Sequence, residues 1–223
     1  MPRIDPALIP KKPTLEFERQ FWQVGIQFVA GIDEAGRGAL AGPVTAAAVI
    51  LPPQGNLERD LAGVRDSKQM TALQRETCST RIYHVALAYG VGFASHEEID
   101  AHGIVPATRL AVQRAIATLS IQAGHLLLDY LLLPDLDIPQ TSLIKGDARS
   151  LTIAAASVIA KTSRDALMIE LDAQYPGYGL AAHKGYGTQA HRQAIERLGP
   201  SEIHRRTFAP VRLQVSKLTS LKA

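Results

Sequence analysis

The stretch Gly31-Ile32-Asp33-Glu34-Ala35-Gly36-Arg37-Gly38 follows an apolar run, residues 26–30, that is typical of a buried strand. Two adjacent carboxylates lie at the end of the predicted strand, and a glycine loop with one cation comes next. Carboxylate oxygens are the ligands of hard divalent cations, and glycines let main-chain N–H groups approach phosphate oxygens closely. The pattern indicates metal-dependent chemistry on a polyanion, although an ordinary strand-to-turn junction has the same composition.

Length and composition favour one ordinary domain. The chain has 223 residues, of which 46% are hydrophobic and 20% are charged, which is enough apolar material for a sizeable core. Cys78 is the only cysteine, so no intrachain disulfide forms and a reducing cytoplasm is the expected location. No apolar run reaches 18 residues, which argues against a membrane span. We expect a cytoplasmic monomer, because no assembly motif appears.

Positive charge gathers near the C-terminus. The net charge of the chain is +3, yet residues 181–223 hold eight Lys or Arg residues against two glutamates. A basic region beside a part of the chain that bears carboxylates suits a polyanionic partner. A solvated basic tail remains the alternative.

Periodicity predicts an α/β fold. Strand patterns cover residues 26–33, 43–51, 86–94, 125–129 and 141–145. Helical patterns cover residues 71–85, 106–122, 150–174 and 189–198, a capping box at Ser95 opens a further short helix, and residues 54–63 have a loop composition. The short connection between the first two strands favours an antiparallel hairpin. Three strands in a meander, followed by strands that alternate with helices, imply a mixed sheet with helices on its faces.

Acidic residues lie at or just past the C-terminal ends of three of these predicted strands: Asp33 and Glu34 at the first, Asp129 at the fourth and Asp147 at the fifth. Sites in open α/β sheets gather at strand ends, so we expect the four carboxylates to converge. Their mutual repulsion would be costly without cations, which is the physical argument for bound metal. Asp129 as a turn former and Asp147 as a first-turn helix acid are the alternatives. No Cys and His cluster has zinc spacing.

Several separated motifs resemble those of the ribonuclease HII family, in the family's order and across roughly residues 25–212. They are Gly31-Ile32-Asp33-Glu34-Ala35-Gly36-Arg37-Gly38, continued to Val44, then Asp66-Ser67-Lys68, Lys145-Gly146-Asp147-Ala148-Arg149, Ala154–Lys161 with Arg164-Asp165, His183-Lys184-Gly185-Tyr186 and His204-Arg205-Arg206-Thr207-Phe208.

The resemblance implies an RNase H-like fold, with a five-stranded mixed sheet flanked by helices and a helical C-terminal region. It implies an N-terminal arm over residues 1–24, a catalytic domain over 25–212 whose basic helical part begins near residue 181, and a tail over 213–223. The implied activity is endonucleolytic cleavage of the RNA strand of RNA–DNA hybrids. Cleavage 5′ of single ribonucleotides embedded in duplex DNA is also implied, by two-metal-ion hydrolysis that leaves 3′-hydroxyl and 5′-phosphate ends.

The resemblance also assigns expected roles. Asp33, Glu34, Asp129 and Asp147 would be catalytic, and the first three would hold a divalent metal, Mg²⁺ or Mn²⁺. The substrate-binding set is Gly36, Arg37, Gly38, Ser67, Lys68, Lys184 and Tyr186. The glycine loop would sense the 2′-hydroxyl, which is the group that distinguishes RNA from DNA. Tyr186 would pack on the adjacent deoxyribose, and the cations would contact phosphates without reading sequence.

Alternatives remain for some of these residues. Tyr130 stands where the family commonly has glycine, and the nearby Asp135 and Asp137 leave the third metal ligand open. Lys161 and Arg164 have the spacing of ion pairs with Asp165 or Asp172, and His183 and His204 suit a structural role. A non-catalytic hybrid-binding module would not need four carboxylates. A nuclease for branched DNA would not need the glycine loop together with Tyr186.

Overall fold

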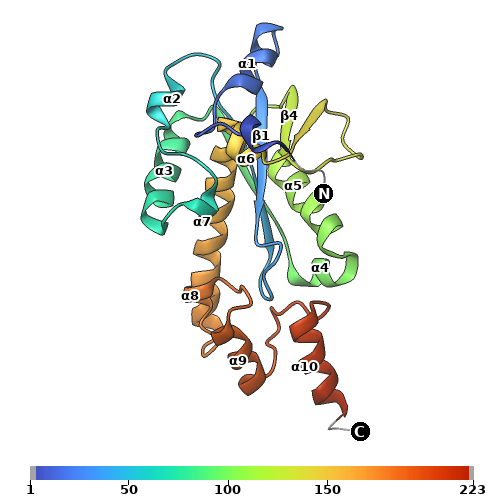
Figure 1. The fold of residues 1–223 in the computed structure, drawn as a ribbon. Helices are drawn as coiled ribbons and strands as arrows, with labels where there is room; N and C mark the ends of the chain where they lie inside the picture. Colours follow the sequence, from blue (N-terminus) through green and yellow to red (C-terminus); the bar gives the residue numbers. More distant parts are fainter. Residues whose placement is uncertain (1–3, 221–223) are drawn as a thin grey trace.

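The computed structural model describes residues 4–220 (Figure 1). Five strands form its sheet: β1 Val29–Ala35, β2 Val44–Ile50, β3 Ala88–Ala94, β4 His125–Asp129 and β5 Gln140–Leu143. The helical elements are η1 Pro6–Leu8, α1 Glu16–Gln23, α2 Leu57–Asp60, η2 Ser67–Gln69, α3 Ala72–Val85, α4 His96–His102, α5 Ile104–Ala117, α6 Gly146–Arg149, α7 Leu151–Gln174, α8 Leu180–His183, α9 Gln189–Leu198 and α10 Ala209–Ser220.

The sheet has the order β3-β2-β1-β4-β5 and is mixed, as the sequence predicts. β1, β2 and β3 form an antiparallel meander, whereas β4 runs parallel to β1 and β5 runs parallel to β4. The register pairs Ile32 with Leu128, so Asp33 and Asp129 are the next residues of two neighbouring parallel strands. Acidic residues far apart in the chain are thus brought to the same end of the sheet.

Helices cover both faces of this sheet. The apolar body of α7 packs on β1 and β2 with α3 beside it, and the core on this side includes Val49, Cys78 and Ile159. α5 packs on β3 and β2 over the other face, where Ile32 and Leu128 are buried. This is a layered α/β architecture in which helices bury the apolar side chains on each face of the sheet.

Glycine lets both helices approach the sheet closely. A Cβ atom at Gly31 would lie 2.3 Å from the carbonyl carbon of Thr152 in α7, and one at Gly92 would lie 2.2 Å from the carbonyl oxygen of Ala111 in α5. Any side chain at either position would push a helix away from the strand. The close contact of α7 with β1 matters for the site, because α7 also carries Ser157 and Lys161.

Most predicted boundaries shift by a few residues, and α5 ends at Ala117, five residues before the predicted end at residue 122. Two differences matter for the description of the site and its surroundings. β1 extends to Ala35, two residues beyond the predicted end, because its backbone stays paired with β2 through Ala35. Asp33 and Glu34 therefore lie within a regular strand, with alternating side-chain directions. Residues 54–63, predicted as loop, contain the single turn α2, which buries Leu57.

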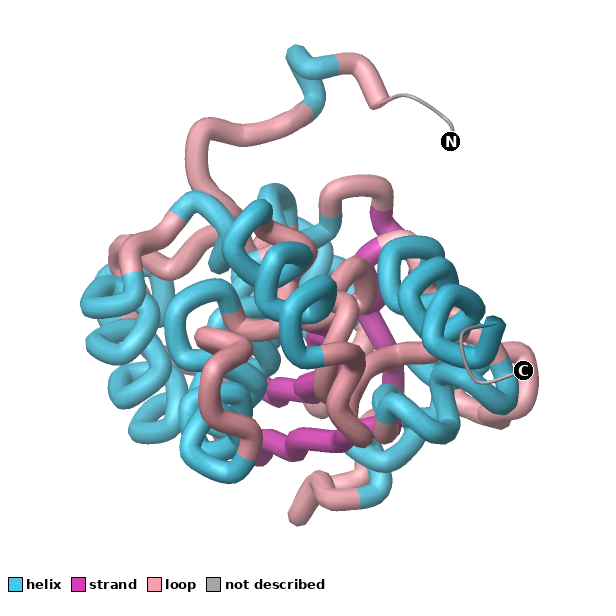
Figure 2. The backbone as a smooth tube through the Cα atoms, turned by 90° about the horizontal axis from the view of Figure 1, so that it is seen from below, coloured by secondary structure: helices cyan, strands magenta, loops and turns pink. Residues whose placement is uncertain are grey.

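Residues 14–23, which the sequence assigns to the arm, pack against the domain. The carboxylate of Glu18 in α1 is fully buried and accepts hydrogen bonds from the Ser150 hydroxyl (2.6 Å) and the Thr152 N–H group (2.9 Å). These groups form the N-terminus of α7, where a negative charge is favourable. Residues 4–12 extend outward from the main body of the molecule (Figure 2), whereas Pro13 itself is buried.

The C-terminal helices gather at one end of the molecule (Figure 1). Their shared core includes Leu40 and Met168 from the main domain and Leu180, Ile195 and Val211 from the C-terminal segment. α10 runs across residue 213, where the tail was predicted to begin. Within residues 4–220, no helix is both long enough and apolar enough to span a bilayer.

The contact between α4 and α5 generates a stability prediction. Glu98 completes the capping box of α4 with Ser95 and binds Arg114 of α5 at 2.7 Å. The hydrogen bond from Arg114, and then that from the Ser95 backbone, lower the pKa of Glu98 from its ordinary value of 4.5 to about 2. The stabilisation is therefore present above pH 4.5 and is lost as the pH falls toward 2.

We expect Glu98→Gln to lower the free energy of unfolding by about 1 kcal/mol at pH 7, since the pair is partly exposed. Urea unfolding of both proteins at pH 7 and at pH 3 checks this. If the variant were as much less stable than the parent at pH 3 as at pH 7, the charge of Glu98 would not be responsible for the difference.

Candidate active site

Asp33 and Glu34 occupy the last part of β1, between β2 and β4. The Asp33 side chain is buried, with 3% of its surface exposed, and its Oδ1 atom accepts a hydrogen bond from the Glu34 N–H group at 2.8 Å. Its Oδ2 atom is buried without a hydrogen-bond partner. The Glu34 side chain is only slightly exposed and forms an ion pair with Arg37 at 2.9 Å.

Asp129 is the last residue of β4, and its carboxylate binds the turn that precedes α6. The Gly146 N–H group donates to Asp129 Oδ1 at 2.7 Å, which fixes the turn between β5 and α6 on this carboxylate. Asp147 follows in the first turn of α6 and is buried. Lys145, at the N-cap, adopts the left-handed conformation with φ of 54° and offers no side-chain cap. The fifth strand and the short α6 thus bring Asp147 to the acidic group.

The four carboxylates lie close enough to influence one another. Burial, and next the charges of Glu34 and Asp129, raise the pKa of Asp33 well above its ordinary value. Burial also raises the pKa of Asp129, and burial followed by the charge of Asp129 raises the pKa of Asp147 to about 6. The structure therefore brings the four carboxylates near one another, and their mutual repulsion opposes full ionisation of the group in the absence of cations.

Lys68 is a second cation beside this acidic group, in addition to Arg37. Its ammonium group lies 3.8 Å from Asp147, although 70% of its side chain is exposed. Burial tends to lower the pKa of Lys68, but the charges of Asp33, Asp147 and Asp66 outweigh it and raise the pKa. η2 positions this residue, because Asp66 caps the turn through the Lys68 N–H group and the Ser67 hydroxyl lies 2.9 Å from that of Ser157.

The acidic residues fit a hard divalent cation. Their carboxylate oxygens are the ligands that such an ion prefers. A bound ion would also offset the repulsion between the carboxylates and give the buried Asp33 Oδ2 atom a partner. Within residues 4–220, no three His, Cys, Asp or Glu side chains form a preformed metal cage.

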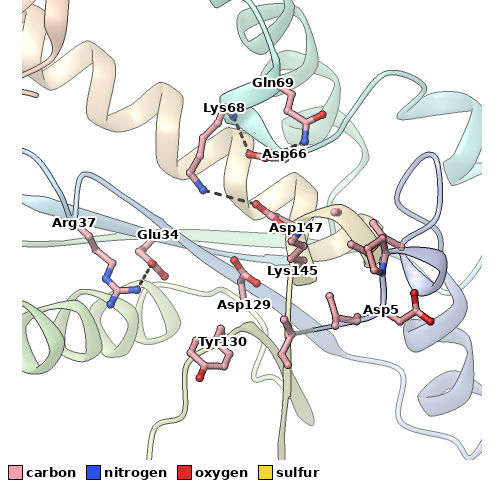
Figure 3. A pocket seen from close by; sticks show the side chains of 15 residues that line it. Asp5, Glu34, Arg37, Asp66, Lys68, Gln69, Asp129, Tyr130, Lys145 and Asp147 are labelled. Carbon is pink, nitrogen blue, oxygen red and sulfur yellow. Dashed lines mark hydrogen bonds and ion pairs between the residues drawn. The ribbon is translucent and has the colours of Figure 1, made fainter. Parts of the chain in front are cut away.

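A cavity of about 1210 Å³ opens beside these carboxylates (Figure 3). Glu34, Asp129 and Asp147 turn toward it, with Arg37 and Lys68 at its margin. The expectation that Asp129 rather than Asp135 or Asp137 joins the acidic group agrees with this lining, which contains neither alternative. Residues of the N-terminal segment, among them Ile4 and Asp5, form part of the wall.

A second cavity of about 550 Å³ adjoins the first and holds the glycine loop. It shares Glu34, Arg37 and Lys68 with the first cavity. Its other lining residues are Ala35, Gly36, Gly38, Ser67, Arg75, Lys161 and Tyr186. Nearly all the predicted substrate-binding residues are therefore brought together. Lys184 is the exception, because its ammonium group donates to the Ala181 carbonyl oxygen.

Arg164 binds main-chain carbonyl groups next to the glycine loop. This differs from the alternative that it pairs with an acid on its own helix. Its buried guanidinium donates to the carbonyl oxygens of Pro43 (2.9 Å), Lys184 (2.8 Å) and Ala41 (3.1 Å). Gly36 has a φ of 90°, and a Cβ atom there would lie 1.9 Å from Arg164 Nε. Only glycine can occupy this position, since both the conformation and the space exclude a side chain.

Arg205 supports the same loop from the C-terminal side. Its buried guanidinium donates to the carbonyl oxygens of Gly42 (3.0 Å) and Arg37 (2.8 Å). Burial, followed by the charge of Arg164, lowers the pKa of Arg205 to about 9. Two buried cations thus bind main-chain carbonyl groups and not carboxylates, and they fix the path of residues 37–43.

Tyr186 lies over two cations of α7. Lys161 Nζ is 5.4 Å and Arg164 Cζ is 5.5 Å from the centre of its ring. Lys161 also pairs with Asp165 at 2.6 Å, as its spacing suggests, and Arg75 reaches the same carboxylate. Sequence reasoning did not find Arg75 as a lining residue, because only the packing of α3 against α7 brings it to the cavity.

Comparisons with known proteins show which family this chain resembles. The sequence model of the Ribonuclease HII family matches residues 30–211. Ribonuclease HII of Synechococcus sp. (strain JA-3-3Ab) is 56% identical over 201 residues, which cover 90% of each chain. The crystal structure of ribonuclease H2 from Pyrococcus horikoshii OT3 aligns with a TM-score of 0.71 at 27% identity, over 86% of this chain and 98% of that one.

The structure of Bst-RNase HIII in complex with Mn²⁺ aligns with a TM-score of 0.64 at 19% identity, over 89% of this chain and 72% of that one, which shows a shared fold. The family model matches most of the chain, and the sequence match covers most of both partners. This chain therefore belongs to the ribonuclease HII family and is a metal-dependent nuclease.

Proposed function

We propose that this protein is an endonuclease that cleaves the RNA strand of RNA–DNA hybrids and incises duplex DNA 5′ of single embedded ribonucleotides. The products would carry 3′-hydroxyl and 5′-phosphate ends. The observation that carries the proposal is one continuous cleft, in which the acidic cavity and the cavity of the glycine loop share Glu34, Arg37 and Lys68. Cytoplasmic location and a monomeric state stay predictions from the sequence.

The acidic residues would supply the metal site. Asp33, Glu34 and Asp129 would hold Mg²⁺ or Mn²⁺, and Asp147 would complete the negative group. When bound, two divalent ions activate water and stabilise the leaving oxygen of a phosphodiester. The Asp33 carboxylate is held in place by the Glu34 N–H group and the Asp129 carboxylate by the Gly146 N–H group, so neither has to be ordered during the reaction.

The cations at the margin of the cleft would orient the scissile strand. Lys68 and Arg37 each pair with a carboxylate of the site and stand where the two cavities meet. A phosphate that enters between them would replace the carboxylates as the partner of both cations. Such contacts bind any sequence, so affinity would fall steeply with salt.

The glycine loop would recognise the ribose. Gly36 and Gly38 line the second cavity, and the main-chain groups of such a loop can bind a 2′-hydroxyl whatever the base. The Tyr186 ring lies across the same cavity. A flat ring against the next sugar leaves little room for an added hydroxyl, so the pair would select an RNA-to-DNA step.

The first test removes one carboxylate. We expect Asp33→Asn to lower cleavage of a duplex with one embedded ribonucleotide by about 10²–10³-fold, with binding affinity within a few-fold of the parent. EDTA would abolish parental activity in the same assay, and an all-DNA duplex would stay intact. Asp135→Asn is the matched control, because Asp135 is exposed and lies outside the cavity. Full activity of Asp33→Asn would overturn the acidic site.

The same variant should be more stable than its parent in EDTA. Because the pKa of Asp33 is raised above its unfolded value of 3.8, ionising it costs more in the folded state, and this penalty applies above pH 3.8. We expect Asp33→Asn to raise Tm by about 3–6 °C at pH 7 and the gap to close below pH 4. Thermal unfolding of both proteins, monitored by circular dichroism, shows whether the substitution raises or lowers Tm. A lower Tm at pH 7 contradicts the repulsion argument.

Substrate selection tests the role of the tyrosine ring. We expect Tyr186→Ala to lower cleavage at a single embedded ribonucleotide by about ten- to hundredfold, and to affect a continuous RNA–DNA hybrid less. Tyr186→Phe keeps the ring and should retain the parental preference. The readout is the ratio of kcat/KM on the two substrates. Equal losses on both would mean that the ring does not read the sugar step.

A further inference from the structure

The glycine loop continues into a small backbone ladder that joins three separate segments. The Leu40 N–H group donates to the Gly185 carbonyl oxygen at 2.8 Å, and the Leu40 carbonyl oxygen accepts from the Arg205 N–H group at 2.8 Å. Isolated bridges pair Ala39 with Tyr186 and Ala41 with His204. The position of Tyr186 relative to the loop thus depends on contacts between residues almost 150 positions apart.

Two buried histidines connect the outer segments of this ladder. His191 from α9 and His204 are both fully buried, and their Nε2 atoms lie 3.1 Å apart. His191 Nδ1 lies 3.0 Å from the Tyr186 carbonyl oxygen. His204 Nδ1 lies 3.0 Å from the Ser201 backbone nitrogen and 2.8 Å from the Ser201 hydroxyl. A continuous chain of contacts therefore runs from Ser201 to Tyr186.

The protons in this chain can be arranged in only one way when both rings are neutral. A backbone N–H group can only donate, so His204 Nδ1 accepts from Ser201 and its proton resides on Nε2. That proton points at His191 Nε2, which must then be the acceptor. His191 therefore carries its proton on Nδ1 and donates it to the Tyr186 carbonyl oxygen. Protonation of either ring would place two N–H groups against each other.

We propose that His191 and His204 are positioning residues that hold the Tyr186 backbone against the glycine loop, and through it the ring that reads the sugar step. This inference rests on the proposed function for its effect on selectivity. Neither histidine lines the two cavities, so both act through Tyr186 and not on the substrate.

The surroundings keep both rings neutral at working pH. Burial, and then the charge of His183, lower the pKa of His191 to about 4, whereas burial, and then the charge of His191, lower the pKa of His204 to about 4. The titratable groups that face them are His183, stacked on His191 with centroids 4.2 Å apart, and Tyr178 and His96 on the side of His204. His183 donates from Nε2 to the Tyr178 carbonyl oxygen, since its Nδ1 accepts from the Gly185 N–H group.

Two variants of one residue separate the two contacts of His191. In His191→Asn the amide nitrogen can replace Nδ1 and keep the contact with Tyr186, whereas in His191→Gln the amide oxygen can replace Nε2 and keep the contact with His204. We expect His191→Gln to lower kcat/KM at a single embedded ribonucleotide by about tenfold or more relative to a continuous hybrid, and His191→Asn to preserve most of the parental ratio. A space-filling role would lower Tm in both variants and leave the ratio unchanged.

A spectroscopic measurement on the unmodified protein tests the relay without relying on folding of the variants. Nitrogen-15 NMR of the histidine rings should show His204 as the Nε2–H tautomer and His191 as the Nδ1–H tautomer from pH 8 to pH 5. Either opposite tautomer, or titration of either ring near pH 6.5, overturns the relay.

The two proposals fail differently. If the unmodified protein cuts no ribonucleotide-containing duplex, the proposed function fails, and the effect on selectivity fails with it. If the unmodified protein is active and both His191 variants keep the parental ratio, the positioning role alone is overturned.

Discussion

Two buried guanidinium groups hold the loop on which the site depends. Arg164 and Arg205 together donate to five main-chain carbonyl groups, all within residues 37–43 except that of Lys184. Burial of a charge is costly, and here charge-assisted hydrogen bonds offset the cost without a carboxylate partner. Because the donors come from α7 and from the C-terminal segment, the loop keeps its shape only when both parts of the chain are folded around it.

The acidic group next to this loop has the opposite character, since its members repel one another. Burial raises the pKa values of Asp33, Asp129 and Asp147 for the same reason in each case, namely that an ionised carboxylate loses hydration. The fold tolerates this because regular backbone contacts hold Asp33 and Asp129, and Lys68 offsets part of the charge. A site that is electrostatically unfavourable when empty gains most from binding cations, so stability and function are opposed at these positions.

The two halves of the cleft are supported by different parts of the molecule. The sheet and α6 position the carboxylates, whereas α7 and the C-terminal helices position the glycine loop and Tyr186. The ladder between residues 39–42, 185–186 and 203–205 joins these supports. The charge of the basic C-terminal segment is compatible with a solvated tail. The ladder shows that this segment also supports the part of the site proposed to face the sugar.

Local pattern was enough to predict much of this protein. β4 and α9 begin and end at the predicted residues, and the acids at the strand ends follow from strand periodicity, because side-chain direction and capping depend on near neighbours in the chain. Only the tertiary structure decided the partners of the long polar side chains. Arg164 binds carbonyl groups from distant loops although an acid was available on its own helix, Lys184 turns away from the cleft, and His191 meets His204. These outcomes depend on which segments pack together in the folded chain, because the spacing of residues along the sequence does not show which polar groups will meet, whether they are 13 residues apart, as His191 and His204 are, or more than 100, as Arg164 and Ala41 are.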